Sequence, residues 1–189
     1  QDKFFDGVIN NFVESYSNAE TPIPCIKCNQ TVKFTDLLNE AKNMQADALV
    51  TGHYARRKGG LNNAKLYKAV DLKKDQTYFL FATLQEQLNY IRFPLGNYLK
   101  SEIREMALNY NLSVNDKPDS QDICFVSSSS YREFIQKYQP EHNKEGNIYN
   151  SRMELIGKHK GITNYTVGQR KGIGIGGFKK HKKFHYNEQ

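Results

Sequence analysis

Apolar residues recur at helical spacing in two stretches near the start of the chain. In residues 1–20 they follow a period of roughly 3.6, which predicts the end of a helix there. A second stretch predicts a helix from about Phe34 to Met44 with a single apolar face. Between them, Thr21-Pro22-Ile23-Pro24 predicts an extended turn, because proline fixes its own φ and disfavours helix in the preceding residue.

A short apolar run, Ala48-Leu49-Val50, is followed by Thr51-Gly52 and predicts a buried strand that ends in a loop. The order helix then strand favours a parallel α/β sheet, in which binding sites gather at the carboxyl ends of the strands. Gly59-Gly60 predicts a hairpin-like turn before the segment from Lys65 to Val70.

The rest of the chain alternates short helical and polar segments. We expect helical structure through Tyr78-Phe79-Leu80 to Leu84, and a helix from about Ser101 to Tyr110. The apolar side chains of the second of these helices that would face the core are Ile103, Met106, Ala107 and Tyr110. A short helix is expected at Tyr131 to Tyr138, and glycines with alternating residues predict a small β-rich domain from Gly146 onward. We place the domain boundary near residue 125.

Composition is that of a folded, basic chain. Of its 189 residues 38% are hydrophobic and 25% are charged, which argues against wholesale disorder. No run of about 18 apolar residues occurs and no signal peptide is visible, so we expect a cytoplasmic protein without a membrane partner. The net charge is +7, but part of it lies in Lys179-Lys180-His181-Lys182-Lys183, so charge alone does not decide between a nucleic-acid partner and a solvated tail.

Three cysteines, an odd number without secretory features, favour reactive or metal-binding thiols over a disulfide framework. Cys25-Ile26-Lys27-Cys28 is a CxxC that we expect on a proline-bounded loop just before a helix, where the helix N-terminus would lower a thiol pKa. Zinc or iron–sulfur ligation, completed by Cys124 and histidines, and a purely structural role remain alternatives. Cys124 follows the polar segment Asp119-Ser120-Gln121-Asp122, which favours a thiol beside a loop over a buried one.

Three further segments are weaker candidates. Gly172 to Gly177 matches G-x-G-x-x-G, but no strand–turn–helix unit surrounds it, so we interpret it as a glycine loop beside phosphate-binding side chains rather than a dinucleotide site. His53 follows the predicted strand, where a ligand can approach the backbone, although a lone histidine is more often structural. Lys74-Asp75-Gln76 fits either a solvated helix start or a group that contacts bases or phosphates.

Taken together, ordered blocks of this sequence resemble the bacterial and organellar tRNA-specific 2-thiouridylase family. The similarity covers nearly everything from about residue 5 to Gly177. The blocks are Thr21-Pro22-Ile23-Pro24-Cys25-Ile26-Lys27-Cys28-Asn29 with Val32-Lys33-Phe34, Thr51-Gly52-His53-Tyr54, Lys74-Asp75-Gln76 with Tyr78-Phe79-Leu80, Lys117-Pro118-Asp119-Ser120-Gln121-Asp122-Ile123-Cys124-Phe125, and Tyr165-Thr166-Val167-Gly168-Gln169-Arg170-Lys171-Gly172.

The resemblance implies a chemistry. Such enzymes use ATP, with Mg²⁺, to adenylate the C2 oxygen of the wobble uridine in tRNA, and a persulfide sulfur from a sulfur-carrier protein then replaces that oxygen. By resemblance, Cys124 carries the persulfide and Cys28 is the nucleophile, and the two would form a disulfide during turnover. The implied ATP contact is Gly52, and the implied tRNA contacts are Ile23, Pro24, Cys25, His53, Lys74, Asp75 and Gln76.

The resemblance also implies the fold class and the domains. The fold class is α/β: the C-terminal part of a parallel-sheet, adenine-nucleotide-hydrolase-like (PP-loop) domain, followed by a small, partly β central domain. We expect residues 1–125 to form the first, residues 126–177 a tRNA-binding domain, and residues 178–189 a basic tail.

Two family segments have no counterpart here. The family begins with a Ser-Gly-Gly-x-Asp-Ser loop that wraps the ATP phosphates, and it ends with a β-barrel domain. We therefore expect a truncated member that does not consume ATP alone, with a non-catalytic tRNA-binding remnant or split-gene subunit as the alternative. Cys25 stands where many members carry an acidic residue, and this keeps an iron–sulfur cluster among the alternatives.

Overall fold

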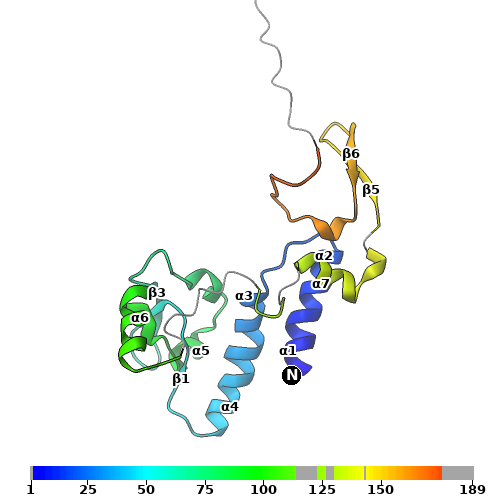
Figure 1. Cartoon of the computed structure of the whole chain (residues 1–189). Coiled ribbons are helices and arrows are strands. Elements are labelled where there is room, and N and C mark those ends of the chain that lie inside the picture. Colours follow the sequence, from blue (N-terminus) through cyan, green and yellow to red (C-terminus); the bar gives the residue numbers. More distant parts are fainter. Residues whose placement is uncertain (1, 114–122, 127–129, 143, 176–189) are drawn as a thin grey trace, which may run out of the picture. The chain divides into compact units, whose positions relative to one another are not determined.

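The computed structural model describes residues 2–113, 123–126, 130–142 and 144–175. The chain divides into two compact units (Figure 1). Unit 1 comprises residues 1–14 and 22–128, and unit 2 comprises residues 15–21 and 129–189. The Gly172–Gly177 loop is described only to residue 175, and the expected basic tail lies outside the described residues.

The first helix confirms the periodicity of residues 1–20. It runs through α1 (Asp2–Phe4), the π-helical segment η1 (Phe5–Asn10) and α2 (Asn11–Ser17). The side chains of Val8, Phe12 and Val13 are buried, as their spacing predicts.

A second, longer helix runs through α3 (Pro24–Cys28), the π-helical segment η2 (Asn29–Asp36) and α4 (Leu37–Asn43) (Figure 1). The sequence predicted its start near Phe34, which is about ten residues too late. Pro24 occupies the first helical position, where a missing N–H costs nothing and a fixed φ suits the helix. The prediction that the CxxC lies on a loop was therefore wrong, because Cys25 and Cys28 lie in the first turns of this helix.

The predicted parallel pairing is present. Strand β1 (Leu49–Val50) pairs in parallel with β4 (Ile91–Arg92), in the register Leu49 with Ile91. Their carboxyl ends therefore lie at the same edge, followed by Thr51-Gly52-His53 after β1. Val50 is exposed, so β1 is less buried than its apolar run predicted.

A hairpin forms at Gly59-Gly60, as predicted. Strand β2 (Ala55–Lys58) pairs antiparallel with β3 (Lys65–Lys68). The 3-10 segment η4 (Pro94–Asn97) lies against β2 so closely that a Cβ on Gly96 would stand 1.7 Å from the carbonyl oxygen of Ala55. Only glycine permits this approach.

The remaining elements of unit 1 are η3 (Thr77–Leu80), α5 (Gln85–Tyr90) and α6 (Lys100–Asn109). The core of unit 1 joins the second helix to these strands and turns. Its buried side chains include Phe34, Leu38, Ala55, Leu80, Leu88, Ile91 and Phe93. This core fixes the second helix beside the carboxyl ends of the parallel strands.

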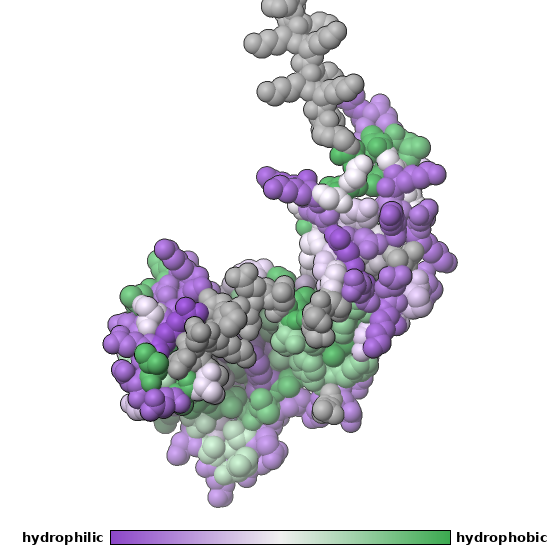
Figure 2. All heavy atoms as spheres, in the orientation of Figure 1, coloured by the Kyte–Doolittle hydropathy of each residue, from purple (hydrophilic) through white to green (hydrophobic). Residues whose placement is uncertain are grey.

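Helix α6 lies within one residue of the predicted bounds at each end but lacks the predicted burial. None of its residues is buried, and Met106 and Tyr110 are exposed. Hydrophobic residues also reach the surface elsewhere, as Figure 2 shows among the hydrophilic ones. Periodicity predicts which face of a helix is apolar, whereas burial depends on whether another element covers that face.

Unit 2 contains α7 (Tyr131–Tyr138), η5 (Pro140–His142), β5 (Gly146–Tyr149), β6 (Leu155–His159) and η6 (Ile162–Asn164). Helix α7 has the predicted bounds, and β5 and β6 form an antiparallel hairpin that confirms the β character of this region. Ile135 is fully buried, and the ring of Tyr131 stacks on that of Tyr16 with centroids 5.1 Å apart.

Candidate functional site

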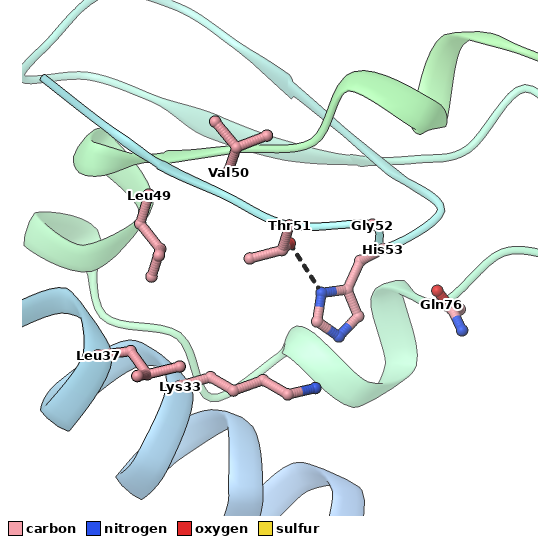
Figure 3. Close-up of a pocket in the computed structure, with 8 residues that line it drawn as sticks. All are labelled: Lys33, Leu37, Leu49, Val50, Thr51, Gly52, His53 and Gln76. Carbon is pink, nitrogen blue, oxygen red and sulfur yellow. Dashed lines mark hydrogen bonds between the residues drawn. The ribbon is translucent and has the colours of Figure 1, made fainter. Parts of the chain in front are cut away.

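A cavity of about 450 Å³ opens at the carboxyl end of β1, between that strand and the second helix (Figure 3). It is lined by Lys33, Leu37, Leu49, Val50, Thr51, Gly52, His53 and Gln76. Ligands of open α/β sheets bind in this position, outside the carboxyl ends of the strands. The structure thus places the predicted residues Gly52, His53 and Gln76 around one hollow.

His53 is held on several sides. Its Nδ1 lies 2.9 Å from Thr51 Oγ1, and its ring contacts those of Phe34 and Phe93 edge-on, with centroids 6.0 and 6.1 Å away. Burial, and secondly the positive charge of Lys33, lower the pKa of His53 to about 4. The imidazole is therefore neutral at physiological pH, and it offers a hydrogen-bonding nitrogen rather than a positive charge.

Gly52 exposes its backbone at the cavity. A Cβ built at this position would meet only Leu95 Cδ1, at 3.7 Å, which is an ordinary contact. The fold itself therefore does not require glycine here, in contrast to Gly96. The absence of a side chain leaves the backbone of Gly52 accessible from the cavity.

In the Lys74-Asp75-Gln76 segment, the side chains of Asp75 and Gln76 accept hydrogen bonds from the backbone. The amide N–H of Tyr54 donates to Gln76 Oε1 at 2.9 Å, and the amide of Ala69 donates to Asp75 Oδ1 at 2.7 Å. These bonds fix the loop that follows β3. Lys74 is exposed at its turn.

The three cysteines all belong to unit 1. Cys25 and Cys124 are exposed, Cys28 is half-buried, and all three are free thiols. The ring of Phe125 meets those of Phe4 and Phe12 edge-on, which anchors the segment Ile123–Val126 on the first helix. The polar segment that precedes Cys124 in the sequence lies outside the described residues.

Partial burial raises the pKa of the Cys28 thiol; Lys33 opposes that shift, and Cys124 and Cys25 add to it. The pKa of Cys25 is raised by burial and then by Cys124, against Lys33. The expectation that a helix N-terminus lowers these values was therefore wrong, because desolvation outweighs it. Cys124 is thus among the causes of the raised pKa values of both Cys25 and Cys28.

Sequence reasoning missed Lys33 as a site residue. Its amino group influences Cys25, Cys28 and His53, and its side chain extends from the helix toward the His53 ring (Figure 3). Lys33 follows Cys28 by five residues, which is the spacing of the i→i+5 hydrogen bonds in η2, the π-helical segment that begins directly after Cys28. The α-helical period would have placed them on different faces, and only a search at the π spacing would have paired them.

The other predicted contacts lie at the start of the same helix. Ile23 precedes its first turn and is exposed, whereas Pro24 is buried. Among the described residues, no group of three or more His, Cys, Asp or Glu side chains forms a candidate metal site. Cys28 and Cys124 are both free thiols, so the structure does not support a standing disulfide between them. No helix in the described part of the chain is long and apolar enough to cross a membrane.

Comparison with known families is consistent with this geometry. The model of the tRNA methyl transferase HUP domain matches residues 1–128, and that of the tRNA methyl transferase PRC-barrel domain matches residues 132–186. A tRNA-specific 2-thiouridylase, MnmA, of Orientia tsutsugamushi is 57% identical over 175 residues, and one of Rickettsia prowazekii is 51% identical over 175. The chain belongs to the tRNA-specific 2-thiouridylase family.

These alignments cover 93% of this chain and 47% and 49% of the two relatives. The chain thus spans about half the length of the curated relatives it matches. Its fold class is that of the family, an α/β HUP domain followed by a PRC-barrel segment, as the resemblance implied.

Proposed function

We propose that this chain supplies the sulfur-handling thiols, and part of the surface that holds nucleotide and tRNA, for 2-thiolation of a uridine in tRNA. One observation carries the proposal. Lys33, which opposes the rise in the pKa values of Cys25 and Cys28, also lines the cavity at the end of β1. Cys25, Cys28 and this cavity would thereby belong to one site. Relatives named tRNA-specific 2-thiouridylases support this assignment.

The cavity suits ATP. It lies where α/β sheets bind nucleotides, Gly52 leaves the backbone accessible, and Lys33 offers a cation to a phosphate. ATP would supply the adenylyl group that converts the uridine C2 oxygen into a leaving group. Mg²⁺ would accompany the phosphates, since it is bound mainly by their oxygens.

The thiols would then exchange sulfur for oxygen. The outer sulfur of a Cys124 persulfide attacks C2, and the oxygen leaves with its electron pair as AMP. The Cys28 thiolate attacks the inner sulfur of Cys124, the persulfide S–S bond breaks toward C2, and 2-thiouridine forms together with a Cys28–Cys124 disulfide. A dithiol reductant restores both thiols with two electrons. A persulfide carrier protein would reload Cys124.

The tRNA would enter at the thiol end of the second helix. Ile23, Pro24 and Cys25 would border the target base, and His53 and Lys74 would contact nearby nucleotides. Asp75 and Gln76 hold their loop through Ala69 and Tyr54, so they would act by positioning Lys74. An unstacked wobble base fits this route, because RNA sequence is recognised chiefly on unstacked single strands.

A chimera tests the proposal without requiring that the chain act alone. The segment of the Orientia relative that aligns with this chain is replaced by it, and the product is supplied with ATP, persulfide donor and unmodified tRNA. We expect 2-thiouridine by mass spectrometry of digested tRNA, and its loss in Cys28→Ser and Cys124→Ser. A chimera that binds tRNA and stays folded but forms no 2-thiouridine would replace this proposal with a tRNA-binding role. Cysteine-bound iron or zinc in the anaerobically purified protein would instead favour a metal centre.

A further inference from the structure

Two aromatic rings lie exposed side by side on the turn η3 and the residue after it. Tyr78 is 62% exposed and Phe81 is 68% exposed, and their ring centroids are 6.4 Å apart with planes tilted by 48°. Leu80 between them is 1% exposed and belongs to the core. The buried leucine anchors the turn and leaves both rings in solvent. Transfer of an exposed aromatic ring from water into a contact is favourable, so both rings would gain free energy from a partner that covers them.

The turn is fixed to the helix that carries the thiols. Asn29 directly follows Cys28 and is buried, and its Nδ2 donates to the carbonyl oxygen of Phe79 at 2.9 Å. Gln76, which lines the cavity of Figure 3, directly precedes η3. The exposed rings therefore belong to the surroundings of the candidate site rather than to a remote surface.

The charge around the rings suits a polyanion. Lys73 and Lys74 are exposed in the turn that leads into this segment, whereas Asp71 and Asp75 of the same turn are half-buried and accept hydrogen bonds from backbone amides. Lysines beside exposed aromatic rings are the usual combination for single-stranded nucleic acid, because the cations attract phosphates while the rings stack on bases. A purely apolar protein partner would gain nothing from these lysines.

We propose that Tyr78 and Phe81 form a stacking platform for unstacked RNA bases next to the target uridine. This inference rests on the proposed function for the identity of the RNA. The platform would hold the neighbours of the target uridine in place while the uridine itself enters the site. Every base has a π-face, so the platform would select unpaired nucleotides rather than a particular sequence.

The test measures binding of the 189-residue chain to two fluorescent RNAs by anisotropy: an anticodon stem-loop with a wobble uridine, and the same stem closed as a fully paired duplex. Tyr78→Ala and Phe81→Ala should each weaken binding to the stem-loop by roughly 5- to 100-fold, the range found when one base loses its stacking partner. Tyr78→Phe and Phe81→Tyr keep the rings and should stay within about twofold of the parent.

The matched control is Tyr110→Ala, which removes a tyrosine that is 76% exposed in the same unit, at the end of α6. It should leave binding unchanged, and thermal melting should show that all variants remain folded. Unchanged stem-loop affinity in Tyr78→Ala and Phe81→Ala would overturn the platform while leaving the thiolation proposal intact. If the alanine variants lose affinity for the stem-loop but the chimera forms no 2-thiouridine, the platform is supported and the thiolation proposal is overturned. A change of oligomeric state in these two variants, with RNA binding unaffected, would assign the rings to a contact between copies of the chain.

Discussion

Thr51 Oγ1 lies 2.9 Å from His53 Nδ1 at the rim of the cavity that follows β1. This contact fixes the orientation of the imidazole, and it leaves Nε2 as the nitrogen available to a ligand. Because burial and Lys33 keep the ring neutral, His53 is suited to hydrogen bonding with a nucleotide or a base rather than to pairing with a phosphate.

The pKa of His53 gives the first prediction. Its value of about 4 in the folded chain lies below the ordinary 6.5, so between these pH values the unfolded chain binds a proton that the folded chain does not. Stability is therefore complete above pH 6.5 and decreases as pH falls toward 4. The loss attributable to His53 should not exceed about 3 kcal/mol, because the ring is only partly buried.

Urea denaturation of the parent and of His53→Gln from pH 7 to pH 4 measures this contribution. The difference in unfolding free energy between the two should change across the window, and NMR should show the imidazole neutral at pH 6. A His53 resonance that titrates near 6.5 would contradict the assignment.

Lys33 should control thiol reactivity. Its charge opposes the rise in the pKa values of Cys25 and Cys28, so Lys33→Met should raise both values and leave less thiolate at pH 8. We expect iodoacetamide to alkylate Cys28 roughly 3- to 10-fold more slowly in this variant. Lys42→Met, on α4 of the same helix, is the control and should react like the parent. Equal rates in all three proteins would remove Lys33 from the site.

Gly52 should be required for ligand binding but not for folding. The Cβ of Gly52→Ala finds room beside Leu95, so the variant should melt like the parent. In the Orientia chimera it should nevertheless weaken binding of ATP or AMP by about tenfold or more, equivalent to about 1.4 kcal/mol. Calorimetric titration measures this, and unchanged nucleotide affinity would argue against a backbone contact at Gly52.

Gly96 provides the opposite case. The Cβ of Gly96→Ala would collide with the carbonyl oxygen of Ala55 in β2, so η4 would have to move away from the strand. We expect a loss of about 2–4 kcal/mol in the free energy of unfolding, as for overpacked sites. Urea denaturation of Gly96→Ala measures this loss, with Gly52→Ala as the matched substitution. Identical midpoints would show that the contact relaxes without cost.

Local signals in the sequence predicted part of the fold well. Helix α7 and the hairpin at Gly59-Gly60 follow from periodicity and from a glycine turn, which depend on neighbouring residues alone. The start of the second helix was missed, because a proline that follows a turn suits both a loop and a first helical position. The exposure of α6 was also missed, because burial depends on the neighbours that the chain folds against a helix.

The site was predictable in its position and not in its electrostatics. Gly52 and His53 were expected at the end of a strand and lie there, whereas their roles remain predictions. The direction of the cysteine pKa shifts was wrong, since desolvation of a sulfur depends on tertiary packing. Lys33 escaped notice because its spacing from Cys28 is that of a π-helix rather than of an α-helix.

Locating the persulfide tests the central claim most directly. The 189-residue chain is incubated with a persulfide donor, blocked with an alkylating agent, and digested for mass spectrometry. Our account predicts one added sulfur on Cys124, removable by a dithiol. When the persulfide is left to react, the Cys28 thiolate attacks its inner sulfur, hydrosulfide leaves, and a Cys28–Cys124 disulfide forms. Cys25→Ser should change neither product. Persulfide confined to Cys25, or equal labelling of all three cysteines that persists in urea, would contradict the assignment of Cys124 as sulfur carrier and Cys28 as its partner.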